Sequence, residues 1–415
     1  MGFNDEVQSW ITNNWNLDLT LREWWQRLAD SGYAFPAWPK NFGGLGSTVS
    51  QTREIHRLLG EAGTIGAPTG IAPNMGAATI FSHGNDEQRE RFIPGVANGT
   101  ELWCQLFSEP GAGSDLASLG TRAIRDGDEF IVTGQKVWNS SAESAEWGML
   151  LARTDVDRPK HQGISWMLID MKQPGIEARP LLQMNGSAEF CEVFLNEARV
   201  PIANVIGAVN DGWNIARTTL THERSSIGQQ YARGLTEIKA GGQSTNLDRR
   251  VGELIDSAKK ASRDPNKRFD IMVGAKSMIR LFKDLGLSED RVARDKVVSY
   301  YIRSEVHRLT GQRSRDNAKG GKPGPEGSIV KLSTALLAHI SRDISLSLLG
   351  AEGMLIGADA RENGRIQRAG LSSFAPSLGG GTNEIQRNII GERSLGLPRD
   401  PFDDNETPFK ELRRS

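Results

Sequence analysis

The spacing of hydrophobic and polar residues changes twice along this chain of 415 residues. From Asp18 to Gly99, helical runs such as Leu21–Ala29 alternate with loops rich in proline and glycine. Between Glu101 and Ala208 the pattern becomes short β-rich runs separated by turns, at 149–153, 164–169 and 191–195. After Asp211 the spacing is helical again, with apolar stripes over 211–240, 288–318 and 327–349.

These changes predict an α+β protein of two or three packed units, because a chain of this length exceeds one simple core. We expect an N-terminal helical domain over 1–100, a small, mostly antiparallel β-domain over 101–208 and a C-terminal helical bundle over 209–415. Within the last part, 241–290 is polar and irregular, and 319–326 is expected to be a loop between helices.

Composition narrows the classes of function. The formal net charge is −1 with the two signs interspersed, which argues against a nucleic-acid partner. The N-terminus lacks a signal-peptide pattern, and no window approaches the roughly 18 apolar residues of a membrane span. Cys104 and Cys191 do not form a Cys-x-x-Cys pair, and the histidines are isolated. We expect a cytoplasmic protein with buried free thiols, no metal site and no membrane partner.

The loop Ser108–Asp115 (Ser-Glu-Pro-Gly-Ala-Gly-Ser-Asp) places two hydroxyls and two glycines around a proline. Glycine lets backbone N–H groups approach an anion closely, and serine adds a hydroxyl donor. The loop suits a phosphate or the edge of a flavin, although a stretch of this kind taken alone is more often an ordinary turn.

Two further segments accompany this loop. Asp126–Asp128 has the composition of a hairpin turn, and the β-formers of Glu129–Ser140 predict a strand that ends with Trp138 and Ser140. Gly379–Arg393 is a glycine turn that opens a helix, with Thr382 as the expected N-cap.

These three segments stand in the order found in the acyl-CoA dehydrogenases, and the chain resembles this family from about Asp18 to Pro398. Members of the family are flavoenzymes that oxidise acyl-CoA thioesters. The resemblance implies FAD as cofactor, α,β-dehydrogenation to a trans-2-enoyl-CoA and an electron-transfer flavoprotein as oxidant. It also implies assembly into a tetramer.

The resemblance assigns roles to single residues. Trp138 would lie against the flavin ring, and Ser140 would contact its reactive edge. Ser108 would bond to the pyrimidine side of the ring, and Ser114 would lie near the pyrophosphate. Further contacts with the cofactor are implied at Phe107, Gly113, Thr382 and Glu384.

The catalytic base must be a carboxylate beside the flavin, because a weakly acidic α-proton leaves as a hydride departs from the β-carbon. Many family members carry it just before the Gly-Thr pair that opens the last helix, where this chain has Gly380. Another branch places a glutamate before an arginine on an earlier helix, as in Glu223-Arg224. The resemblance implies Glu223 as base, Arg224 as an orienting residue and the Gly380 N–H, with a flavin ribityl hydroxyl, as donors to the substrate carbonyl.

The helical pattern supports Glu223 independently of the family. Ala216, Leu220, Glu223 and Ile227 follow at spacings of four, three and four, so a carboxylate interrupts an apolar stripe. A structural alternative stays open, in which Glu223 joins a buried ion pair or caps a neighbouring helix. For Arg224 the alternative is a surface pair with a residue one turn away.

The adenine end of the cofactor site departs from the family pattern, in which an arginine and a Phe-Gly pair hold this end of FAD across a subunit interface. This chain has Arg268-Phe269 without the glycine. Arg280, Arg291 or Arg294 could supply the charge, although each is also explained as a solvated residue on a helix face.

Two other functions remain open at this point. One is a flavin monooxygenase on the same fold, and the other is a structural subunit of a heteromeric dehydrogenase whose own flavin site is degraded. The runs Pro323–Ser328 and Gly379–Gly381 resemble bacterial acyl-CoA dehydrogenases of steroid breakdown, several of which are two-subunit pairs. This resemblance implies a bulky, steroid-derived acyl-CoA and a homo- or heterotetramer.

Overall fold

The computed structural model describes residues 2–226, 238, 246–263, 271–319, 326–398 and 406–412. The chain divides into two compact units. The first comprises Met1–Leu182, Ala188–Lys259 and Asp403–Ser415, and the second comprises Gln183–Ser187 and Lys260–Phe402. The division into three domains at about residues 100 and 208 stays a prediction.

The first unit begins with five helices: α1 (Phe3–Asn14), α2 (Leu21–Ser31), α3 (Val49–Glu61), α4 (Ala77–His83) and α5 (Asp86–Ala97). A capping box starts α2, where the Thr20 side chain accepts from the Glu23 N–H, and a second starts α3 at Thr48. The apolar faces of α1 to α3 form one core around Trp24 and Trp25, whose indole N–H groups donate to main-chain carbonyls.

Helix α7 (Val251–Arg263) packs its apolar residues into this same core. Backbone bonds fix its start, since Leu21 N donates to Arg249 O and Val251 N donates to Leu19 O. The expectation that 241–290 is irregular is therefore wrong for this segment, and also for α8 (Ala275–Asp284). Both helices have narrow apolar stripes among many charged residues, so the sequence pattern did not predict them as helices.

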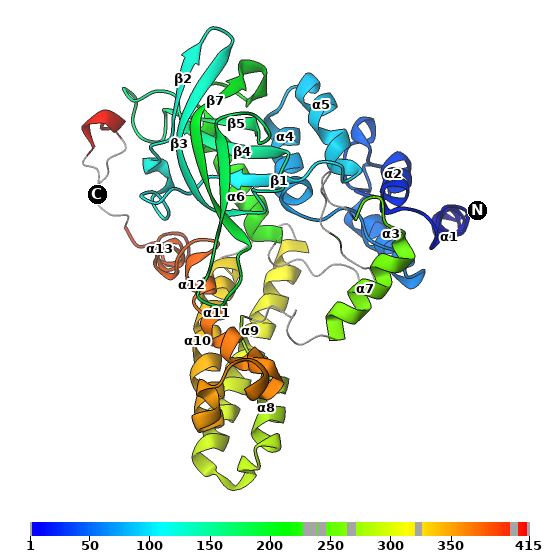
Figure 1. The fold of residues 1–415 in the computed structure, drawn as a ribbon, viewed down its shortest axis with the longest axis vertical. Helices are drawn as coiled ribbons and strands as arrows, with labels where there is room; N and C mark the ends of the chain where they lie inside the picture. The colour runs from blue at the N-terminus through cyan, green and yellow to red at the C-terminus, as the bar shows by residue number, and fades with distance from the viewer. Residues whose placement is uncertain are drawn as a thin grey trace. The chain divides into compact units, whose positions relative to one another are not determined.

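Among the described residues a sheet of eight strands follows. Its arrows run from cyan to green in Figure 1. The strands are β1 (Trp103–Leu106), β2 (Arg122–Asp126), β3 (Glu129–Ser140), β4 (Trp147–Arg153), β5 (Ile164–Asp170), β6 (Ile176–Leu181), β7 (Phe190–Pro201) and β8 (Val205–Ile206). Their order is β6-β7-β3-β2-β4-β5-β8, with β1 beside β4. The predicted hairpin is confirmed, because Asp126 pairs with Glu129. Most pairings are antiparallel as predicted, but β1–β4 and β2–β4 are parallel.

The two faces of the sheet bury different cores. On one face, Trp103, Met149 and Leu168 pack with residues of α4, α5 and α6 (Gly212–Ser226). On the other, Cys104 and Leu106 pack with residues of β3, β5 and β7. Along β1, successive side chains therefore alternate between the two cores.

The second unit is helical, as predicted. Beyond α8 it contains α9 (Arg291–Lys319), α10 (Glu326–Leu349), α11 (Arg365–Ser372), α12 (Ala375–Leu378) and α13 (Asn383–Ser394). Helices α9 and α10 match the stripes predicted at 288–318 and 327–349, whereas most of the 211–240 stripe beyond α6 lies outside the described residues. No described helix combines the length and the hydropathy needed to cross a bilayer.

Candidate active site

The loop after β1 is held by the side chain of Glu109. Its Oε2 accepts from Gly120 N at 2.7 Å, and its Oε1 accepts from Thr121 N at 2.9 Å and from Lys136 Nζ at 2.8 Å. Within the loop, Glu109 and Ala112 exchange two backbone hydrogen bonds. The carboxylate thus joins the loop to β3 and to the segment that leads into β2, which fixes the position of Ser108 just before it.

Lys136 is the buried partner in this anchor. Its side chain is fully buried, and its ammonium also donates to Phe107 O at 3.1 Å. Burial raises the pKa of Glu109, but the Lys136 charge and the donated hydrogen bonds outweigh burial and leave that pKa below its ordinary value. Burial also lowers the pKa of Lys136, against the pull of Glu109. The sequence analysis predicted no role for either residue. A lysine within a run of β-forming residues does, however, indicate a charge that is buried and needs a partner.

Trp138 occupies a β-bulge. Between Lys136 and Asn139, β3 uses one more residue than the facing stretch of β7, and Trp138 takes a left-handed φ of 64°. A non-glycine aromatic residue with positive φ is strained, and such strain is concentrated at functional sites. The bulge leaves the indole 59% exposed and edge-on to Phe190, with 6.0 Å between the ring centroids.

The polar groups around this indole fit a flavin. Val137 N, beside Trp138, donates to Ser108 O at 2.9 Å, so the loop and the bulge are adjacent. Ser108 and Ser140 are half-buried, Gly113 and Ser114 are exposed, and these serine hydroxyls have no hydrogen-bond partner among the described residues. An exposed aromatic plane on the strand of Ser140, joined by that bond to the loop of Ser108, suits a planar ring with polar edges. Phe107 is buried.

Glu223 lies on α6, half-buried, on the helix face that packs against the sheet through Ala216 and Leu220. Its Oε2 accepts from Gln105 Nε2 of β1 at 3.4 Å. The main-chain oxygen of Gln105 in turn accepts a hydrogen bond from Nδ2 of Asn139, the residue after Trp138, at 2.6 Å. The predicted base is thus connected through two hydrogen bonds to the strand that carries the exposed indole. The backbone of Arg224 belongs to α6, but its side chain lies outside the described residues.

Gly380, Thr382 and Glu384 belong to the second unit. Gly380 and Gly381 have φ of 67° and 87°, which glycine adopts without strain, and Gly380 O accepts from Gln386 Nε2. Thr382 is the predicted N-cap of α13, since its Oγ1 accepts from Ile385 N at 3.3 Å. Glu384 is exposed in the first turn and pairs with Arg387 at 2.9 Å.

The residues predicted for the adenine end are less defined. Arg268-Phe269 lies outside the described residues, and Arg280, Arg291 and Arg294 are all exposed on α8 and α9. Within the described parts of the chain, no cluster of histidine, cysteine and carboxylate side chains could hold a metal ion. Cys104 and Cys191 are free and buried as expected, and burial raises the pKa of both thiols.

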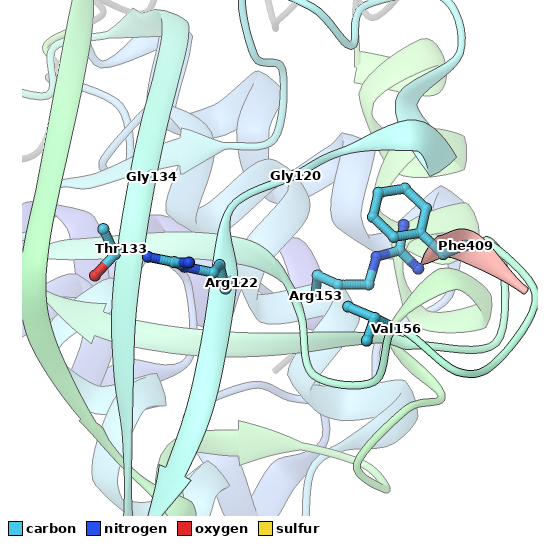
Figure 2. A pocket seen from close by; sticks show the side chains of 7 residues that line it. All are labelled: Gly120, Arg122, Thr133, Gly134, Arg153, Val156 and Phe409. Atoms are coloured by element: carbon cyan, nitrogen blue, oxygen red, sulfur yellow. The ribbon is translucent and has the colours of Figure 1, made fainter. Parts of the chain in front are cut away.

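A separate cavity of about 350 Å³ lies beside the C-terminal segment 406–412 (Figure 2). The Phe409 ring packs on the guanidinium of Arg153, 3.8 Å from the ring centroid. Phe409 N donates to Arg158 O, and Lys410 N donates to Val156 O, so this segment is fastened to the loop after β4. Burial lowers the pKa of Arg153 to about 10. The remaining lining residues are Gly120, Arg122, Thr133 and Gly134.

Comparison with protein families gives three matches along the chain. The acyl-CoA dehydrogenase N-terminal domain matches residues 3–100, the middle domain matches 104–198 and the C-terminal domain matches 280–395. The chain belongs to the acyl-CoA dehydrogenase family. It is an oxidoreductase that acts on acyl-CoA with FAD as cofactor, and the predicted α+β fold of the family is confirmed.

Individual relatives agree. Acyl-CoA dehydrogenase IpdE1 of Mycobacterium tuberculosis is 33% identical over 91% of this chain and 88% of its own length. Acyl-CoA dehydrogenase FadE34 of the same organism is 37% identical over 90% of this chain, which spans 46% of FadE34. These similarities to dehydrogenases do not favour a monooxygenase or a purely structural subunit.

Solved structures share the fold. The ChsE4-ChsE5 complex from Mycobacterium tuberculosis has a chain that is 26% identical, with a TM-score of 0.64 over 96% of this chain and 97% of its own. The steroid acyl-CoA dehydrogenase Tcur3481-Tcur3483 is 24% identical, with a TM-score of 0.68 over 96% of this chain and 97% of its own, and supports the fold alone.

Proposed function

We propose that Glu223 is the base that removes the α-proton of the acyl-CoA. Bound FAD would accept the hydride from the β-carbon. The observation that carries this proposal is the contact between Glu223 Oε2 and Gln105 Nε2, because it places the carboxylate beside the strand next to the Trp138 bulge. A half-buried carboxylate on an apolar helix face costs desolvation free energy. A role in proton transfer explains why the residue is there.

The flavin contacts follow from the same part of the chain. Trp138 would stack on the ring, Ser108 and Ser140 would bond to its edges, and Ser114 would face the pyrophosphate. We add Phe107, Gly113, Thr382 and Glu384 as further contacts and Arg224 as a residue that orients the base. The N–H of Gly380 would donate to the thioester oxygen, where negative charge grows as the proton leaves.

We propose a bulky, steroid-derived acyl-CoA as substrate. The runs Pro323–Ser328 and Gly379–Gly381, which resemble dehydrogenases of steroid breakdown, support this class. The glycine at 380 also leaves no side chain where many relatives carry a carboxylate. An electron-transfer flavoprotein would reoxidise the cofactor, and acyl-CoA substrates make the cytoplasm the expected compartment.

A homo- or heterotetramer is the proposed assembly. Helix α9 exposes Val298, Ile302, Val306 and Leu309 at helical spacing, with exposed fractions of 49 to 59%. An apolar stripe of this kind is typical of a surface that a partner subunit covers. The relative in the ChsE4-ChsE5 complex is itself part of a two-protein assembly.

The experiment is anaerobic reduction of the bound flavin by acyl-CoA, followed at visible wavelengths. Glu223→Gln keeps the shape and the hydrogen-bonding capacity of the side chain but removes the base. We expect it to retain flavin and to lose reduction by a factor of at least about a hundred. The exposed Glu87 of α5 provides the control, and Glu87→Gln should behave like the wild type. Undiminished reduction in Glu223→Gln would refute the assignment.

A further inference from the structure

Gln105 occupies a position where an amide side chain is out of place. The alternation along β1 puts Cys104 and Leu106 into one core and Trp103 into the other. Gln105 shares the face of Trp103 and lies opposite the buried Met149 of β4. An apolar side chain would fill this site without the desolvation cost of an amide, so the residue calls for a polar partner.

That partner is the carboxylate of Glu223. The amide of Gln105 reaches Glu223 Oε2 at 3.4 Å, across the interface between β1 and α6. A separation of this length is at the weak end for a hydrogen bond. Catalytic hydrogen bonds are often long before substrate binds and shorten in the complex.

The backbone of Gln105 is itself held in place. Asn139 Nδ2 donates to Gln105 O at 2.6 Å, and the Asn139 side chain is 1% exposed. Asn139 follows Trp138 directly and closes the bulge on β3. The position of Gln105 is therefore coupled to the position of the exposed indole, so the same strand sets the places of the carboxylate and of the aromatic plane.

We propose that Gln105 is a positioning residue that aims the carboxylate of Glu223 and favours its ionised form, an inference that rests on the assignment of Glu223 as base. A donated N–H stabilises a carboxylate relative to the neutral acid. Because the amide bonds to Oε2, it fixes the direction in which the carboxylate points. Glutamine cannot take up that proton, so the contact keeps the same polarity at every working pH.

Two variants separate the consequences of this arrangement. Gln105→Leu removes the donor at similar volume, and Gln105→Glu replaces it by a like charge. Both should keep flavin, because Gln105 has no proposed contact with the ring. Flavin reduction should slow about tenfold to a hundredfold at neutral pH, as misplaced catalytic groups do. The acid limb of the pH–rate profile should move to higher pH, further for Gln105→Glu than for Gln105→Leu.

The matched control is Gln135, which also lies on a strand and donates to a glutamate, Glu192 Oε2, at 3.0 Å. Gln135→Leu should leave both the rate and the pH profile unchanged. If Gln105→Leu also leaves both unchanged while Glu223→Gln abolishes reduction, the positioning role is overturned and the base assignment stands. If acyl-CoA reduces the flavin of Glu223→Gln at the wild-type rate, the base assignment itself fails. If Gln105→Leu slows flavin reduction but the acid limb of the pH–rate profile does not move, Gln105 only fills space and the proposed role is overturned.

Discussion

Lys136 Nζ lies 2.8 Å from Glu109 Oε1, and the lysine side chain is fully buried. This pair fastens the loop that begins at Ser108 to the strand that carries Trp138. Removal of one partner from a buried ion pair strands the other charge, which typically costs about 3–5 kcal/mol. The pair therefore connects the stability of the sheet with the geometry of the proposed flavin site.

The first prediction is a double-mutant cycle on this pair. Glu109→Gln alone and Lys136→Met alone should each lower the free energy of unfolding by about 3–5 kcal/mol. The double variant should lose less than the sum of the two, because neither charge is left unpaired. Denaturant unfolding of the four proteins measures this coupling. Strict additivity would contradict a direct interaction.

The second prediction concerns acid. The pKa of Glu109 in the folded chain lies below its ordinary value of 4.5, so its contribution to stability is present above that pH. The contribution is lost as pH falls through the folded pKa. The difference in unfolding free energy between the wild type and Glu109→Gln should be constant between about pH 5 and 7 and shrink below about 4.5. A difference that grows on acidification would have the wrong sign.

The third prediction concerns the strained bulge. Trp138→Gly relieves the positive φ but removes the contact with Phe190 and adds freedom to the unfolded chain. These opposing effects should change the stability of the flavin-free protein by less than about 1 kcal/mol. Flavin affinity should fall at least tenfold, because a stacking surface is lost. Trp138→Phe is the comparison variant and should retain most of the affinity; equal affinities for the glycine and phenylalanine variants would exclude stacking.

The fourth prediction concerns residues 406–412. Phe409→Ala removes the ring that covers Arg153 and should release this segment locally. Amide hydrogen exchange at Phe409 and Lys410, whose N–H groups are bonded in the wild type, should accelerate at least tenfold. Amides of β4 should keep their protection. Faster exchange throughout β4 would instead mean that the segment supports the whole sheet.

The sequence was sufficient for the elements with a strong period. The β-forming residues of Glu129–Ser140 and the cap at Thr382 predicted a strand and a helix start that the structure contains. Helix α7 was missed because its apolar residues form a narrow stripe among charged ones, and only packing against α1 to α3 reveals them. The pattern of apolar and polar residues predicts a helix poorly where only contacts with other helices make that helix stable.

The site shows the same limit. The resemblance to one branch of the family implied Glu223, and its place in an apolar stripe supported that role, but neither indicated its partner Gln105. A four-residue strand is too short for one amide side chain to stand out from an apolar pattern. The contact also joins residues far apart in the sequence. The positive φ of Trp138 was equally hidden, because it arises from a register shift between β3 and β7 and not from local sequence.

The most direct test of the account is the visible spectrum of the purified protein under anaerobic conditions with a series of acyl-CoAs. The series should contain short, long, branched and steroid-ring thioesters at equal concentration. The account predicts a bound flavin that the steroid-ring thioester bleaches fastest, with formation of the 2-enoyl product. A flavin that keeps its colour with every thioester would contradict it.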